Sequence, residues 1–129
     1  MRSRILCSGL MIVLAGAALG PGAPLDPKTR AVEGKVEPYR EVSYERSFQA
    51  GIPARVIALG KAAEGYLGLY VFDAHGNCVA RDDEVTTRTV DDTAVEWVPA
   101  QTGPYTIQVN ALGKHPVEFL MTVRQGGAS

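Results

Sequence analysis

Short segments in which apolar and polar residues alternate, separated by Gly- and Pro-containing turns, constrain the fold most strongly. In YTIQVNAL, Tyr105, Ile107 and Val109 alternate with polar neighbours, which is the period of a strand with one buried face. Comparable runs, rich in β-branched and aromatic residues, cover 42–48, 54–59, 67–72, 77–81, 94–98 and 117–123. The pattern predicts an all-β chain, an antiparallel jelly-roll-like β-sandwich of about seven or eight strands. Parallel α/β folds are excluded because their crossover helices are missing from the pattern.

The first 22 residues have the layout of a cleavable signal peptide. Arg2 and Arg4 precede an apolar stretch, which is followed by small and turn-forming residues. The alternative is a membrane anchor, but an apolar run of roughly fifteen residues is short for a bilayer crossing. Cys7 lies at the front of the run and not after it, which argues against a lipoprotein signal. We therefore expect a secreted or periplasmic protein with no membrane contact after cleavage, at a site that the sequence leaves open.

The remaining chain is predicted to form one domain. Residues 23–38 are rich in Pro, Gly and charge without apolar periodicity, and are predicted to be a flexible spacer. The β-sandwich is expected over 39–125, followed by a frayed tail at 126–129. A domain of about a hundred residues can bury a core without covalent cross-links.

Charge and cysteine content exclude several classes of protein. Loss of Arg2 and Arg4 leaves 11 of the 13 basic residues against 14 acidic ones, a net charge of about −3. Such a domain lacks the positive patch that nucleic acids or anionic lipids require. Cleavage would also leave Cys78 as the only cysteine, which excludes a disulfide within the processed chain. We expect Cys78 to be buried, as cysteines commonly are; the oligomeric state stays open.

No catalytic constellation is visible in the sequence. The serines beyond the signal peptide lie in a predicted strand or at the terminus, and no G-x-S-x-G elbow occurs. His75 precedes Cys78 by three residues, but across a tight turn the two side chains need not converge as nucleophile and base. With a distant His115 they supply too few ligands for structural zinc. We predict that the chain is not an enzyme, with a small secreted hydrolase as the remaining alternative.

Calcium is the metal that the acidic residues fit best, because hard cations take oxygen ligands. Asp73, Asp82 and Asp83 are weak candidate ligands, next to further carboxylates around 84–92. The competing interpretation makes Asp73 a turn former in DAHG, with Gly76 supplying a positive φ. No spacing matches an EF-hand loop, so no cofactor is expected, although calcium stays possible.

Two aromatic residues are interpreted as part of the hydrophobic core. Trp97 alternates with Val95 in a predicted strand, and Tyr105 opens the next one. A single aromatic at strand period is ordinary packing material, so a ligand platform is the less favoured alternative.

Three successive segments carry a family resemblance: FQAGIPARVIALG, LGLYVFDAHGNCVARDD and VEWVPAQTGPYTIQVNALG. In order and spacing they resemble the bacterial pre-peptidase C-terminal domain and its stand-alone exported relatives, over about residues 44–123. The resemblance implies a jelly-roll-like β-sandwich associated with secretion, substrate adhesion or calcium-dependent stability. Relatives often carry an acidic pair where this sequence has Tyr66 and Gly68, and if that pair binds calcium in the family, this chain has lost it.

These observations lead to one main hypothesis and two alternatives. The main hypothesis is an exported, non-catalytic binding or structural module that holds a protein or polysaccharide of the cell envelope or medium. It resembles the accessory domain of secreted bacterial proteases. The first alternative is a calcium-dependent stability or adhesion domain; the second is the small secreted hydrolase.

Overall fold

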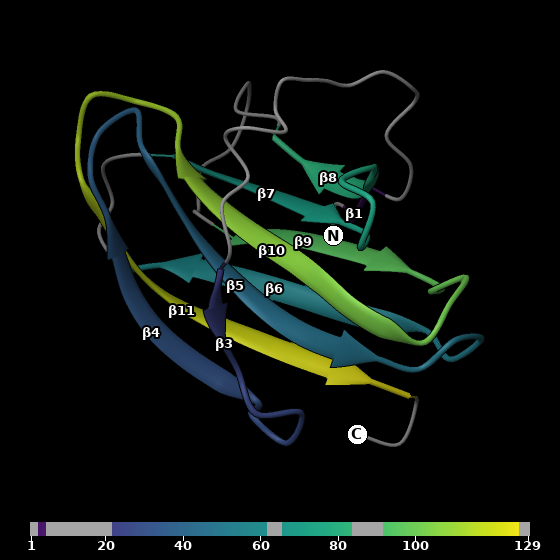
Figure 1. The fold of residues 1–129 in the computed structure, drawn as a ribbon. Coiled ribbons are helices and arrows are strands. Elements are labelled where there is room, and N and C mark those ends of the chain that lie inside the picture. Colours follow the sequence, from purple (N-terminus) through teal and green to yellow (C-terminus); the bar gives the residue numbers. More distant parts are fainter. Residues whose placement is uncertain (1–2, 5–21, 62–65, 84–91, 127–129) are drawn as a thin grey trace.

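The computed structural model describes residues 3–4, 22–61, 66–83 and 92–126 as a β-sandwich of two five-stranded sheets. Figure 1 shows the sheet that contains β5 and β10 lying in front of the sheet that contains β6, β9 and β11. The all-β, sandwich-like prediction is confirmed. The described residues include no helix long and apolar enough to cross a bilayer. Most of the predicted signal peptide lies outside the described residues.

Within the described residues ten strands make up the two sheets, and two of the pairings there are parallel: β1 with β9 and β3 with β5. One sheet has the order β1-β9-β6-β11-β4 and the other β3-β5-β10-β7-β8. The strand bounds are β1 Ser3–Arg4, β3 Ala23–Pro24, β4 Ala31–Val36, β5 Glu41–Phe48, β6 Ala54–Gly60, β7 Leu67–Phe72, β8 Cys78–Asp82, β9 Asp92–Trp97, β10 Gly103–Ala111 and β11 Val117–Gln125.

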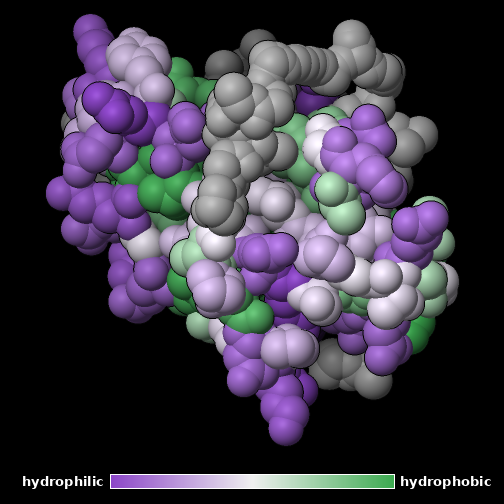
Figure 2. Space-filling model, in the orientation of Figure 1, coloured by the Kyte–Doolittle hydropathy of each residue, from purple (hydrophilic) through white to green (hydrophobic). Residues whose placement is uncertain are grey.

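The core lies between the sheets and follows the alternation seen in the sequence. On β10, Tyr105, Ile107 and Val109 are buried, while the residues between them face outward. Figure 2 shows the result on one face, where hydrophobic residues form small separate patches among hydrophilic ones. Burial of one side chain in two is what a two-layer antiparallel sandwich requires.

The predicted spacer over 23–38 is corrected by the structure, because it contains β3 and β4. β4 pairs with β11 from Ala31↔Thr122 to Val36↔Val117, and Val36 is fully buried. Gly34 sits where an added Cβ would lie 2.6 Å from the Phe119 ring and 2.7 Å from the Tyr44 hydroxyl. The missing side chain lets β4 approach the core, so the folded domain begins well before residue 39.

Hydrogen bonds of Gln125, the last residue of β11, hold the end of this strand against the β5–β6 connection. Gln125 Nε2 donates to the carbonyls of Gln49 and Ile52, at 2.8 and 2.9 Å. The Gly126 N–H donates to the Pro53 carbonyl at 2.8 Å. Gly126 was expected to fray, and this contact corrects that expectation; residues 127–129 are outside the described part.

Candidate functional site

Asp73 builds the turn between β7 and β8. Its Oδ1 accepts the backbone N–H groups of His75 and Asn77, each at 2.9 Å. The Gly76 N–H donates to the Asp73 carbonyl at 3.0 Å, and Gly76 has a φ of 85°. Both features match the turn-forming interpretation, in which the carboxylate mimics a backbone acceptor.

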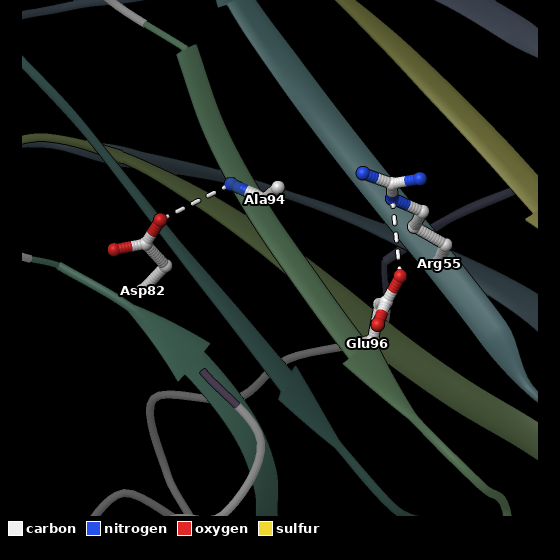
Figure 3. A network of polar contacts seen from close by, with 4 residues as sticks. All are labelled: Arg55, Asp82, Ala94 and Glu96. Atoms are coloured by element: carbon white, nitrogen blue, oxygen red, sulfur yellow. Dashed lines mark hydrogen bonds and ion pairs between the residues drawn. The ribbon is translucent and has the colours of Figure 1, made fainter. Parts of the chain in front are cut away.

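Asp82 points into the molecule and links the two sheets. It is fully buried, and its Oδ2 accepts the Ala94 N–H of β9 at 3.1 Å (Figure 3). Its Oδ1 has no hydrogen-bond partner among the described residues. Next to it, the buried Thr93 hydroxyl donates to the Leu67 carbonyl at 3.2 Å. These polar bonds join β8 and β7 of one sheet to β9 of the other.

Asp83 faces the opposite way from Asp82 and binds a tyrosine. The Tyr70 hydroxyl donates to Asp83 Oδ2 at 2.7 Å. Burial, together with the hydrogen bond and negative charge of Asp83, raises the pKa of Tyr70 well above its ordinary value, against a smaller opposing effect of Arg81. Figure 3 shows a second surface pair, in which Arg55 Nε lies 3.3 Å from Glu96 Oε2.

The three candidate calcium ligands are thus engaged separately: in a turn, in the interior and with a tyrosine. Within the described parts of the chain, no three His, Cys, Asp or Glu side chains come together in a way that could hold a metal. At the position of the missing acidic pair, Leu112 covers Gly68, since an added Cβ would lie 3.2 Å from its side chain. Calcium binding stays an untested prediction.

We expect calcium to have little effect on stability. A melting temperature measured in millimolar calcium should lie within about 1 °C of the value in chelator, because a ligand stabilises only when the folded state binds it. A rise of several degrees that disappears in Asp83→Asn would contradict this and restore the calcium hypothesis.

The Tyr70–Asp83 bond predicts a specific alkaline behaviour. A raised folded-state pKa contributes stability that is complete below the unfolded pKa of about 10 and is lost as pH rises beyond it. Tyr70→Phe should therefore lower the free energy of unfolding by about 1 kcal/mol at neutral pH and flatten its decline above about pH 10. Urea denaturation across that range measures both effects. Tyr39→Phe is the control, since Tyr39 is 70% exposed; identical alkaline profiles for the two variants would count against the assignment.

A cleft of about 570 Å³ opens between the β7–β8 turn and the β9–β10 connection. We call it the end cleft. Its walls come from two stretches that are far apart in the sequence: Asp73, Ala74, His75, Cys78 and Val79 from the first, and Trp97, Val98, Ala100, Gln101, Thr102, Gly103, Pro104 and Tyr105 from the second. Most of this lining is apolar.

Aromatic rings form the floor of the end cleft. The Phe48 ring centroid lies 5.0 Å from that of Trp97 and 5.7 Å from that of Tyr105, both edge-on. Trp97 and Tyr105 are 5% and 4% exposed, which confirms their prediction as core residues. The Tyr105 hydroxyl donates to the Gln101 carbonyl at 3.0 Å, and Thr102 Oγ1 accepts the Ala50 N–H at 2.9 Å. The cleft is therefore shaped by packed, hydrogen-bonded residues.

The rim of the end cleft combines exposed apolar and polar groups. Val98 is 59% exposed, and His75 lies on the opposite wall. Cys78 is only partly buried, contrary to expectation, and it is disulfide-bonded in the full-length chain. The expectation of a disulfide-free domain concerned the processed chain; the other cysteine, Cys7, lies outside the described residues. His115 stands in the β10–β11 connection and does not line the cleft.

Sequence reasoning missed the end cleft, although it identified its floor and its turn. PAQTGP, residues 99–104, was interpreted only as turn material. The usable signal was Val98, an apolar residue directly after the core residue Trp97 and at the outward position of the strand period.

No family model matches the sequence, and no curated protein does. Solved structures nevertheless share the fold, among them the following three. Aeromonas hydrophila PliG, a periplasmic inhibitor of g-type lysozyme, matches with a TM-score of 0.62 and 17% identity over 81% of this chain and 96% of PliG. The pre-peptidase C-terminal domain of Bacillus anthracis collagenase matches with a TM-score of 0.56 and 12% identity, over 81% of this chain and 93% of that domain.

The third is CorA, a surface-associated copper-binding protein of Methylomicrobium album BG8. It matches with a TM-score of 0.61 and 9% identity over 79% of this chain and 96% of CorA. Identities this low establish the fold and not the function. The chain has the fold of the pre-peptidase C-terminal domain, as its sequence segments suggested.

Proposed function

We propose that this protein is an exported, non-catalytic binding module that uses the end cleft to hold a segment of a partner protein. The observation that carries the proposal is the cleft itself: a hollow of about 570 Å³, mostly apolar, on a rigid aromatic floor. Ligand sites in proteins have this size and this mixture of apolar lining with a few polar groups.

A protein partner fits the end cleft better than a polysaccharide. Sugars bind aromatic platforms by stacking on an accessible ring face, and Trp97 and Tyr105 are almost fully buried. An apolar side chain presented on a loop can instead enter the hollow and contact Val79, Val98 and Pro104. The exposed Gln101 and Thr102 on the rim can hydrogen-bond to the partner backbone.

The comparisons support an exported binding role. PliG is a periplasmic inhibitor, CorA is surface-associated, and the collagenase neighbour is a pre-peptidase C-terminal domain. The signal-peptide layout of residues 1–22 agrees with export. Because PliG inhibits a lysozyme, cell-wall lytic enzymes of that kind are the first partners to test.

The test is capture of partners by the chain from Gly22 onward, immobilised and exposed to the native envelope fraction. Val98→Asp places a charge on the cleft wall and should weaken binding of any partner held there by about tenfold, or ~1.4 kcal/mol. Purified lysozymes of several classes are then assayed for inhibition by the wild-type protein and the variant.

Tyr39→Asp is the matched control, because Tyr39 is also an exposed apolar residue. It lies in the β4–β5 turn, at the end of β10 remote from the cleft, beside the Ala111–Arg40 backbone bond. Equal capture by all three proteins would rule out the end cleft as the binding site. Hydrolysis of the partner that depends on His75 would overturn the non-catalytic assignment.

A further inference from the structure

A second hollow, of about 340 Å³, is built from different elements and is lined by cations. Figure 1 places the β3–β4 loop and the end of β11 together at the lower side of the molecule. The hollow between them, which we call the basic pocket, is lined by Pro27, Lys28, Arg30, Arg46, Val123, Arg124 and Gln125. Four of these seven residues are basic and none is acidic.

Arg46 is the unusual member of this set. It sits at an inward position of β5, in phase with Phe48, and is only 8% exposed. Its guanidinium carbon lies 4.7 Å from the centre of the Phe48 ring, and Nη2 donates to the Pro27 carbonyl. Nε and Nη1 have no acceptor within the part of the chain that the structure describes.

No counter-charge neutralises Arg46 directly. Among the described residues, the ion pairs are Lys35–Glu37, Arg55–Glu96 and Lys61–Glu33, so none involves this side chain. Burial lowers the pKa of Arg46, and the charge of Asp26 only partly opposes this. A buried cation is normally paired, because removing it from water is costly.

The other basic residues of the pocket are placed to contact the same ligand as Arg46. Lys28, Arg30 and Arg124 are exposed side chains at the rim. Gln125 is already engaged, since its Oε1 accepts the Gln49 N–H and its Nε2 donates to the Gln49 and Ile52 carbonyls. Asp26 Oδ1 accepts the Lys28 N–H at 2.8 Å, which shapes the loop around the rim.

We propose that the basic pocket binds a small oxyanion, a carboxylate or a phosphate. Arg46 supplies a fixed positive charge at the floor, where the low dielectric strengthens its attraction for an anion. The rim cations complete the coordination with charge-assisted hydrogen bonds, the geometry in which arginine recognises carboxylate and phosphate. The basic pocket shares no lining residue with the end cleft, so either proposal can be overturned without affecting the other.

A purely structural Arg46 is the competing explanation. The contact with the Phe48 ring and the bond to Pro27 would then be its whole role. In that case Arg46→Met, which fills similar space without charge, is neutral or stabilising, and anions have no specific effect.

The experiment is thermal unfolding of the full domain with sodium phosphate, sodium acetate or sodium chloride at matched ionic strength. The wild-type protein should melt several degrees higher in one of the two oxyanions than in chloride. A response to phosphate alone identifies a phosphate ligand, and a response to acetate identifies a carboxylate. Arg46→Met should abolish the shift, and Arg124→Gln should raise the apparent Kd about tenfold.

Arg40→Gln is the charge-matched control, because Arg40 is exposed in the β4–β5 connection and does not line the basic pocket. It should retain the wild-type shift. Arg46→Lys provides a second floor variant should Arg46→Met not fold. Equal melting in all three salts, or an oxyanion shift of the same size in Arg46→Met and Arg40→Gln, overturns the proposal.

Discussion

A chain shortened to begin at Tyr39 should be largely unfolded at room temperature, whereas a chain that begins at Gly22 should fold. The shorter chain lacks β3 and β4, and with them the fully buried Val36 and the six-residue pairing with β11. It also loses the Val123 N–H bond to the Arg30 carbonyl. Removing these two strands should lower the free energy of unfolding by about 5 kcal/mol or more, which is comparable with the whole stability of a domain of this size.

Circular dichroism and urea titration of the two truncated chains measure the difference. The chain from Gly22 controls for loss of the signal peptide, since both chains lack it. Cooperative unfolding of the chain from Tyr39 at the same urea concentration would mean that β4 contributes nothing, and would return residues 23–38 to the role of a spacer.

Truncating the aromatic floor should have the second-largest effect. Trp97→Ala removes a nearly buried indole that contacts both Phe48 and Tyr105, with ring centroids 5.0 and 5.9 Å away. Loss of a buried large aromatic leaves a cavity and costs about 3–5 kcal/mol. The same variant should deepen the end cleft, because Trp97 forms part of its floor, and should abolish partner binding.

The neighbouring Val98→Ala is the control, because Val98 is 59% exposed and should change stability by less than about 0.5 kcal/mol. Far-UV circular dichroism is the appropriate measurement, because Trp97 is the only tryptophan and fluorescence is lost in the variant. A Trp97→Ala protein as stable as Val98→Ala would show that the cluster is not part of the core.

The sequence predicted the strands that carry their own alternating pattern and missed β4, in which the pattern is incomplete. The YTIQVNAL run became β10 because every second side chain is apolar and buried. β4, AVEGKV, alternates Val32, Gly34 and Val36, and the glycine hides the period. Gly34 is required by the Phe119 and Tyr44 side chains that occupy its space, which is long-range information.

The candidate site was less predictable for the same physical reason. Asp73 was interpreted correctly as a turn former because its partners are two and four residues away. The end cleft forms because the turn near residue 75 lies beside the connection near residue 100. No local sequence pattern predicts that these two segments are neighbours in space. Asp82 and Asp83 show the converse: Asp82 ends β8 and Asp83 follows it in extended chain, so their side chains face opposite ways and are poor candidates for one metal.

The bond between Asp82 and Ala94 has a consequence for solubility. β1 covers the outer edge of β9, and it belongs to the segment expected to be removed on export. The processed chain then presents β9 as an edge strand, the kind of surface on which another chain can add a strand. Asp82 occupies the Ala94 N–H that such a strand would need and places a carboxylate beside the edge. We therefore expect the side chain that joins the two sheets also to hinder strand addition at β9 once the segment that contains β1 is removed.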